Sequence, residues 1–515
     1  SANSVSGLAE TWSDALTFRG LESPGDAVAA YEAVTPEAVN KLAATLLDPT
    51  HAVTAVLVPE SSGKAVAGKG FGGAESFASA PDKPVKLPEW AEKALMQLEA
   101  PQPSKQPYVT TLANGLQLIV WPAHVGHTVQ VSGQVRQKPD LQEPEGKEGI
   151  SSVAEELFSY GTTQHNRLAF RKALDDIPAW EEAGGSFSLA VQTPDFEKGM
   201  ALLAENELHP AFPEQAFQVV KAQSAQAQGG VLQSPGYLFE RAIEKALVPP
   251  KDPTLREATP HSIMAISRDD VVKYYQKTWR PDLTTIVITG DITPEKAKAV
   301  VEKEFGAWKA DGPTPNLDLP TVPFNKPSRA NVPDKSSVQD EVVLAQNLGL
   351  LVSNPDHFLL QLGNEVLGGG LFSSRLYRDL RVKTGYVYTV SSAFSWSRTR
   401  ANYSISYGAD PDKVGKARVA AMQDLKDMQS AAPTAEELSL AKASLLRSLP
   451  LRRASLSGIT SEYLNLTQLG LPLDTADRAA QAYYKASAED VQAAFKKWLR
   501  ADGMAQIVKG PTPTW

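Results

Sequence analysis

One pattern occurs three times in the chain, and it restricts the possible fold more than any other feature. Residues 35–59, 267–291 and 487–511 each begin with Ser or Thr, continue as an amphipathic helix, break at a polar turn and end in an apolar run. The Ser or Thr is a typical N-cap, and the acidic residue at the second helical position suits the positive end of a helix. The copies recur every 220 to 230 residues or so, which is the spacing of duplicated domains rather than of a solenoid.

The three copies divide the chain into two complete units and one incomplete unit. We predict one domain over residues 107–325 and a second over 326–515. Residues 1–60 contain the ending without a body, so we expect them to be the tail of a domain that lies mostly on another polypeptide, or else an appendage packed on this chain. Residues 61–106 are rich in Gly, Ala, Ser, Pro and Lys, which is typical of a linker, with one short helix near residues 90–98.

Strand and helix patterns alternate within each unit. The sequence "TTLANGLQLIVWP" predicts a β-hairpin in which Asn114 and Gly115 form a type I′ turn. Helical periodicity is found at residues 153–158, 167–177, 196–208 and 213–228. Hairpins combined with segregated helices indicate an α+β fold with mostly antiparallel sheets rather than a doubly wound one.

Composition excludes several classes of partner and site. The chain of 515 residues carries a net charge of −8 and no Lys/Arg-rich block, which argues against nucleic acid or an anionic membrane as the main partner. No apolar run approaches the roughly 20 residues that span a bilayer. The absence of cysteine excludes disulfides, thiolate zinc sites and a cysteine nucleophile. Together with a first residue that is not Met, it leads us to expect an exported, processed protein of a bacterial periplasm.

No catalytic motif is recognisable from composition alone. None of the seven histidines stands four residues from another on a helix, as a helical zinc pair requires. His124 and His127 lie in a loop after a strand, where a solvated position is expected. The remaining candidate is the acid pair Glu155 and Glu156, which interrupts the apolar helix of "GISSVAEELFSYGTT".

The surroundings of this pair resemble the pitrilysin/insulinase family of zinc peptidases. The resemblance rests on "EGISSVAEELFSYGTT", "AGGSFSLAVQTPDFEKGMALLAENELHPAFPEQAFQVVK" and "KYYQKTWRPDLTTIVITGDITPEKA", which occur in this order. The family's H-x-x-E-H zinc motif then falls on residues 152–156. Glu155 keeps the central glutamate, whereas Ser152 and Glu156 replace the two histidines.

These replacements predict a degenerate site without metal on this chain. Zinc requires two neutral imidazoles one helical turn apart and a downstream carboxylate. A serine hydroxyl is a poor ligand, and the helix over residues 217–230, where the family's third ligand lies, contains no acid. We therefore interpret Ser152, Glu155 and Glu156 as a polar helix face rather than as ligands.

The last domain has a second and stronger likeness to the same family. The segment "LGGGLFSSRLYRDLRVKTGYVYTVSSAF" is similar to its substrate-binding segment, in which an Arg and a Tyr lie seven residues apart. Here they are Arg381 and Tyr388. Locally, we expect a helix that ends near residue 384, a cap at Gly385, and a strand from Tyr386 onwards. The resemblance implies that the pair binds a substrate carbonyl and stabilises an oxyanion.

The resemblance implies one half of a clamshell peptidase. This half would bind peptides in a closed chamber, and a zinc-binding partner would carry H-x-x-E-H, either as a separate subunit of a heterodimer or as the N-terminal fragment of the same precursor. The assembly would be a zinc metalloendopeptidase, and this chain alone would be inactive. The alternatives are a non-catalytic structural or peptide-binding member of the family, and a chain that binds zinc through unfamiliar ligands.

Overall fold

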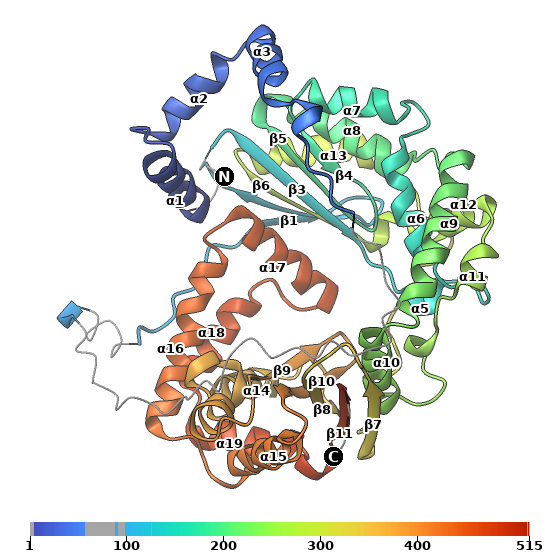
Figure 1. Cartoon of the computed structure of the whole chain (residues 1–515). Coiled ribbons are helices and arrows are strands. Elements are labelled where there is room, and N and C mark those ends of the chain that lie inside the picture. The colour runs from blue at the N-terminus through green and yellow to red at the C-terminus, as the bar shows by residue number, and fades with distance from the viewer. Residues whose placement is uncertain (1–4, 57–87, 91–97, 125, 512, 514–515) are drawn as a thin grey trace.

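The computed structural model describes residues 5–56, 88–90, 98–124, 126–511 and 513. Two mixed β-sheets form two lobes, and each is covered by helices on the face that contains its main hydrophobic core (Figure 1). The α+β prediction is confirmed. None of the helices in the described ranges is both long and apolar enough to cross a membrane.

The first sheet has the strand order β1-β2-β6-β3-β5-β4. Its strands are β1 (Tyr108–Thr111), β2 (Gln117–Pro122), β3 (Thr128–Val135), β4 (Trp180–Glu182), β5 (Ser186–Gln192) and β6 (Thr284–Gly290). The helices of this lobe are α5 (Pro139–Gln142), α6 (Ile150–Leu157), α7 (Arg167–Asp175), α8 (Phe196–Leu208), α9 (Glu214–Val231), α10 (Pro235–Leu247), α11 (Pro260–Met264), α12 (Arg268–Thr278) and α13 (Pro294–Phe305).

The predicted hairpin forms, but its turn differs from the type I′ prediction. Strands β1 and β2 pair antiparallel, with Thr111 opposite Gln117. Leu112 N–H donates to the Leu116 carbonyl, which closes a three-residue loop. Only Gly115 of this loop has a positive φ, +91°, whereas a type I′ turn needs two such residues. Asn114 instead keeps a negative φ, and its side chain donates a hydrogen bond to the Phe305 carbonyl that holds it in this conformation.

The second sheet has the order β7-β11-β8-β10-β9. Its strands are β7 (Ser328–Pro333), β8 (Asp340–Leu348), β9 (Thr389–Trp396), β10 (Ala401–Ala409) and β11 (Ala505–Gly510). The helices are α14 (Asp356–Asn364), α15 (Val414–Ser430), α16 (Ala435–Arg452), α17 (Leu456–Leu469), α18 (Thr475–Lys485) and α19 (Ala488–Trp498), with π-helical turns η7 (Glu365–Gly369) and η9 (Tyr377–Lys383).

The two complete copies of the repeated ending occupy the same place in the two sheets. Strand β6 follows α12 and lies between β2, to which it is parallel, and β3, to which it is antiparallel. Strand β11 follows α19 and lies in the same way between β7 and β8. Each copy also has a 3-10 turn at the same offset, η6 (Pro281–Leu283) and η10 (Ala501–Gly503).

The lobes exchange one helix each. Helix α10 of the first lobe packs on the second sheet, with Phe239 and Leu247 in a cluster with Val343 and Ile507. Helix α17 of the second lobe packs on the first sheet, where Tyr463 joins a cluster with residues of β2 and β6. Figure 1 shows α17 between the two sheets. The exchange covers apolar sheet surface on both sides and fixes the lobes relative to each other.

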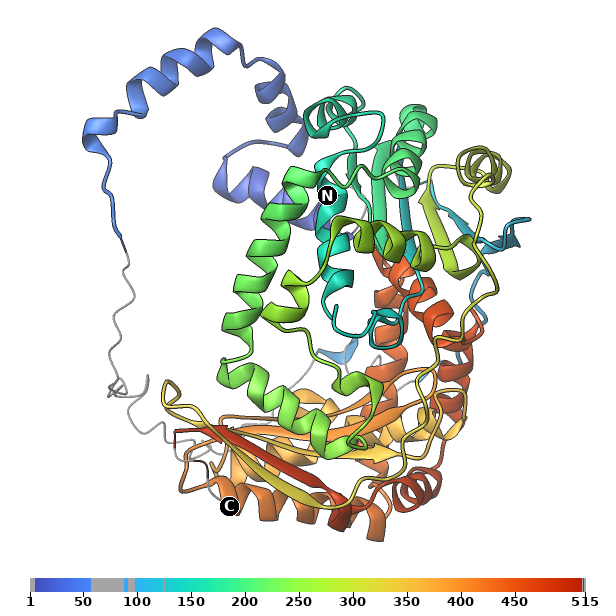
Figure 2. The same ribbon diagram turned by 90° about the vertical axis from the view of Figure 1, so that its right-hand side faces the viewer.

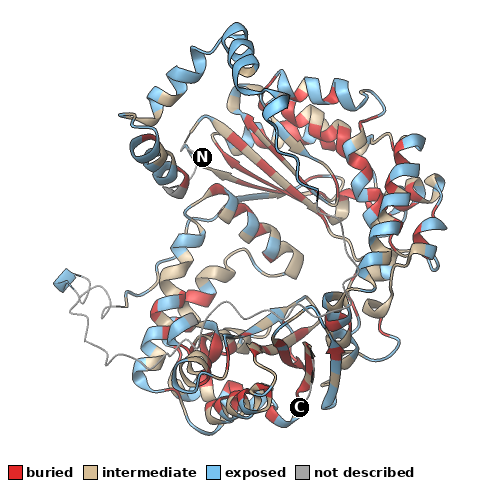
Figure 3. Ribbon diagram, in the orientation of Figure 1, coloured by how far each residue is buried: buried red, intermediate tan, exposed pale blue. Residues whose placement is uncertain are grey.

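The N-terminal copy has the helix and the turn, and its described residues form no strand. Helices α1 (Val5–Ser13), α2 (Pro24–Glu32) and α3 (Pro36–Leu46) run along the outside of the molecule, followed by the 3-10 turn η2 (Pro49–His51) (Figures 1 and 2). Residues 52–56, the described part of the expected strand, are exposed and are not paired with another strand (Figure 3). A single segment cannot satisfy the N–H and C=O groups of a strand without neighbours. The predicted linker helix at 90–98 lies largely outside the described residues.

Candidate functional site

The degenerate motif lies on the exposed face of helix α6. Ile150, Val153, Ala154 and Leu157 are buried in the main core of the first lobe. Ser152, Glu155 and Glu156 point away from that core, as expected for a polar helix face.

Glu155 nevertheless has a defined contact. Its two carboxylate oxygens accept hydrogen bonds from Gly185 N–H at 2.8 and 3.0 Å, at the turn between β4 and β5. Partial desolvation raises the pKa of Glu155. The carboxylate borders a depression of about 280 Å³ that is otherwise lined by uncharged residues, including Ser152 and, from helix α17, Gln468. Glu155 therefore orders a turn at the edge of the sheet.

A second glutamate behind this turn was not anticipated from the sequence. Glu207 on α8 is fully buried, and it accepts a hydrogen bond from Gly184 N–H through Oε2 at 2.9 Å. Its Oε1 has no partner, and burial holds its pKa well above the usual range. Nearby, burial raises the pKa of Glu181 to about 7. Its position in the sequence does indicate burial, because Glu207 lies at helical spacing from Met200, Leu203 and Ala204 on the buried face of α8.

These residues do not fit a zinc ion. The motif offers one hydroxyl and two carboxylates but no imidazole, and Glu155 and Glu207 are already used as acceptors of the β4–β5 turn. His165 of this lobe pairs with Glu205 at 2.9 Å, just before α7 rather than on α6. Within the described ranges, no three His, Asp or Glu side chains are placed to bind a metal.

Arg381 and Tyr388 lie together in the second lobe. The Arg381 guanidinium carbon is 5.6 Å from the centre of the Tyr388 ring, and its Nη1 donates to the Val387 carbonyl at 3.1 Å. Tyr388 is 43% exposed, and its hydroxyl donates to Asp410 at 3.1 Å. Partial desolvation and, next, the Asp410 carboxylate raise the pKa of Tyr388. The structure thus presents a guanidinium and a phenol side by side at the surface.

The backbone between them differs in part from the prediction. The helix ends in the π-helical turn η9, and Gly385 has a φ of +61°, consistent with the expected glycine cap. The strand begins at Thr389 rather than at Tyr386, because Tyr386 N–H donates back to the Leu380 carbonyl and not to β10. π-helical turns often occur at functional sites.

The glycine run of this segment is explained by packing. A side chain at Gly368 would meet the backbone nitrogen of Ser392 at 2.9 Å, and one at Gly369 would meet Asn364. Gly368 and Gly369 also form part of a depression of about 520 Å³ beside Tyr388. Its aromatic residues are Phe372, Tyr377, Tyr388 and Tyr407. This depression has the size and character of a side-chain pocket.

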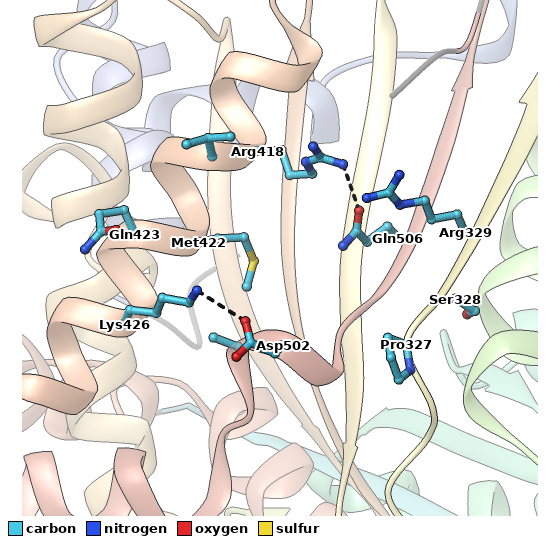
Figure 4. Close-up of a pocket in the computed structure, with 11 residues that line it drawn as sticks. Pro327, Ser328, Arg329, Arg418, Met422, Gln423, Lys426, Asp502 and Gln506 are labelled. Carbon is cyan, nitrogen blue, oxygen red and sulfur yellow. Dashed lines mark hydrogen bonds and ion pairs between the residues drawn. The ribbon is translucent and has the colours of Figure 1, made fainter.

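A second depression of about 500 Å³ lies where α15 meets β7 and β11 (Figure 4). Arg418, Met422 and Lys426 line it from successive turns of α15. Both charged side chains already have partners: Arg418 donates to Gln506 at 3.2 Å, and Lys426 pairs with Asp502 at 3.2 Å. These contacts tie α15 to strand β11 and to η10, which gives the depression a structural role.

Known proteins resemble this chain over most of its length. The family model described as the peptidase M16 inactive domain matches residues 265–445. An uncharacterized zinc protease YmxG of Bacillus subtilis is 24% identical over 311 residues, which are 59% of this chain and 74% of the relative. A non-peptidase homolog YmxG of Helicobacter pylori is 23% identical over 357 residues, 67% of this chain and 80% of the relative.

Two solved structures have the same fold. The peptidase M16 inactive domain from Pseudomonas fluorescens has a TM-score of 0.70 at 22% identity and covers 79% of this chain and 98% of its own. The periplasmic protease PqqL from Escherichia coli has a TM-score of 0.68 at 16% identity, covering 94% of this chain, which spans 52% of PqqL. Residues 265–445 thus match the peptidase M16 inactive domain, and the chain has the fold of solved proteins that carry this domain.

Proposed function

We propose that this chain is the non-zinc, substrate-binding half of a zinc metalloendopeptidase. The observation that carries the proposal is the pairing of Arg381 and Tyr388 at the surface, beside an aromatic-lined depression. A guanidinium and a phenol can both donate to one carbonyl oxygen, and both bonds strengthen as negative charge develops on that oxygen. The Tyr388 hydroxyl would exchange its present acceptor, Asp410, for the substrate.

The zinc ion would be bound by a partner polypeptide that bears H-x-x-E-H. In the assembled enzyme that zinc would polarise the scissile carbonyl and activate water. Arg381 and Tyr388 would hold the peptide against it. Substrates would be peptides or unfolded segments that enter a closed chamber between the halves. The periplasmic relative PqqL supports an exported location.

The exposed N-terminal helices support such a partner. Helix α3 repeats α12 and α19 but presents Leu42 and Leu46 to solvent, followed by the unpaired Val53 and Val56. In the two complete copies, the matching residues lie against a helix and between two strands. Residues 1–60 would therefore complete a domain of the zinc-binding half, whether that half is a separate subunit or part of the same precursor.

The proposal is tested by the assembled complex. Arg381→Ala and Tyr388→Phe should each reduce peptide turnover by about 10²-fold, as expected when one donor to a developing oxyanion is removed. Phe372→Ala, on the rim of the depression, should change KM and leave zinc content unaffected. Full turnover by both Arg381→Ala and Tyr388→Phe would refute the assigned role.

A peptide-binding member without catalysis is the second candidate, and the name of the Helicobacter pylori relative, a non-peptidase homolog, favours it. The isolated chain distinguishes the two. Peptide binding that no zinc-bearing partner converts into cleavage would support the second candidate. Stoichiometric zinc bound by the isolated chain would contradict both.

A further inference from the structure

A buried pair of aspartates lies beneath the turn that carries Arg381. Asp424 on α15 is 8% exposed, and its carboxylate interacts with that of Asp379 on η9, the turn against which α15 packs. Two carboxylates cannot bond to each other, since neither has a donor. Asp424 Oδ2 also lacks any partner in the described structure. A proton on Asp424 removes one charge and supplies a donor toward Asp379.

The charges around the pair show which member holds the proton. Asp379 accepts two hydrogen bonds from Arg378, at 3.0 and 3.2 Å, and pairs with Lys383 at 2.7 Å, so it is stabilised as the carboxylate. Asp424 interacts with Asp379, with Asp427 of its own helix and, most weakly, with Arg378. From α16, Glu437 approaches Arg378 at 3.7 Å rather than Asp424. Asp424 is therefore the acid and Asp379 the base.

We propose that Asp424 and Asp379 share one proton, and that this pair clamps η9 onto α15 and so positions Arg381. When the proton leaves, two like charges adjoin in a buried place, and the π-helical turn loosens from α15. Asp379 is two residues from Arg381, and the Thr384 hydroxyl that closes the turn donates to the Asp379 carbonyl at 3.0 Å. The effect on peptide binding rests on the function proposed above for Arg381; the clamp itself does not.

The pH range of the clamp is physiological. Burial and the neighbouring Asp379 carboxylate raise the pKa of Asp424 to about 7, whereas Asp379 is held below its usual range by Arg378 and Lys383. The protonated fraction of Asp424 therefore falls as the pH rises through neutrality. The clamp is therefore closed in mildly acidic conditions and open in mildly alkaline ones.

The test combines hydrogen exchange with peptide binding on the full chain. In the unmodified protein, exchange of residues 377–384, corrected for its intrinsic pH dependence, should rise between pH 6 and pH 8. Asp424→Asn keeps a donor without a titrating proton and should give low exchange at both pH values, whereas Asp424→Ala should give high exchange at both. Asp427→Asn, one turn further along α15, should behave as the unmodified protein does.

Labelled β-casein, an unfolded polypeptide, serves as the binding probe. Its affinity should fall by at least about threefold from pH 6 to pH 8 in the unmodified protein and stay constant in Asp424→Asn. Should Asp424→Asn not fold, Asp379→Asn removes the same carboxylate pair and should likewise abolish the pH step in exchange. An unchanged pH step in exchange after either substitution would overturn the clamp. A normal exchange result without any casein binding would refute the proposed function of Arg381 and leave the clamp supported.

Discussion

The three copies of the helix–turn–strand unit have one local structure and two different environments. All three have an N-capped helix and a 3-10 turn at the same offsets. The fifth residue from the start is Val in each copy: Val271 and Val491 are completely buried, whereas Val39 is 52% exposed. The helix and the turn are thus encoded within the unit, whereas among the described residues the strand is found in the two copies where a sheet supplies neighbours on both sides.

The largest expected difference between the copies comes from a charge at this shared valine. Val271→Asp or Val491→Asp places an unpaired carboxylate in a core and should destabilise its lobe by about 4 kcal/mol or more. Val39→Asp should change the stability of the isolated chain by less than about 0.5 kcal/mol, since the residue is exposed. Thermal unfolding followed by circular dichroism measures all three. A large loss at Val39 would show that α3 packs on this chain after all.

Truncation of the same valines gives a smaller and more quantitative test. Val271→Ala and Val491→Ala should each cost about 2 kcal/mol, from lost burial and the cavity left behind. Val39→Ala should be close to neutral in the isolated chain but should weaken the complex with the zinc-binding half. Urea unfolding of the chain and titration with that partner separate the two effects. Equal costs at all three positions in the isolated chain would contradict the difference in environment.

The two buried copies also differ in what they bury. In the first lobe the Tyr275 hydroxyl donates to the Glu207 carbonyl at 2.7 Å, and the Trp279 side chain lies beside the Glu207 carboxyl. The matching residues of the last copy are Phe495 and Leu499, which pack in an apolar core. In the first lobe, therefore, a buried carboxyl lies next to these two positions of the repeated helix–turn unit, whereas the matching positions of the last copy are apolar.

This difference predicts a pH dependence that Glu207→Gln removes. The pKa of Glu207 is raised in the folded state, so the folded protein holds the proton more strongly than the unfolded chain does. The contribution of Glu207 to the free energy of unfolding should therefore be fully present at low pH. It should decline as the pH rises above the pKa of a glutamate in the unfolded chain, about 4.3. Glu207→Gln preserves an acceptor for Gly184 and should flatten this decline, while the exposed Glu214→Gln should not. A decline that persists unchanged in Glu207→Gln would assign it to other groups.

Local patterns were sufficient to predict several helices and the proximity of Arg381 and Tyr388, a pair that the family resemblance singled out. Arg381 and Tyr388 are seven residues apart, so a helix end and a glycine cap bring them together without help from the rest of the fold. The periodicity over residues 196–208 likewise matched α8. Such predictions depend only on neighbours in sequence.

The remaining features depend on contacts between distant segments. The loop at Asn114 takes its shape from carbonyls near residue 305, and the Asp379–Asp424 pair exists because α15 packs under η9. Ser152, Glu155 and Glu156 lie on the exposed face of α6, but the acceptor role of Glu155 depends on the position of Gly185. Contacts between side chains 30 or more residues apart in the sequence are determined by tertiary packing, and no local pattern in the sequence predicts them.

The smallest expected effects concern the N-caps, and the free energy lost by each helix when its cap is removed should be alike in all copies. Thr35, Ser267 and Ser487 each accept a backbone N–H three residues later, at 3.1 to 3.2 Å. Replacing each by Ala should cost its own helix about 1 kcal/mol, because the cap acts within one turn whatever the helix packs on. Hydrogen exchange of the first turn of α3, α12 and α19 compares the three in one experiment. Because α3 has little packing to offset the loss, the exchange rate of its first turn should rise by the full factor, about fivefold. The exchange rates of the first turns of α12 and α19 should rise less, because the buried faces of these helices hold them in place. Protection of α3 that does not change in Thr35→Ala would mean that contacts other than the cap hold this helix.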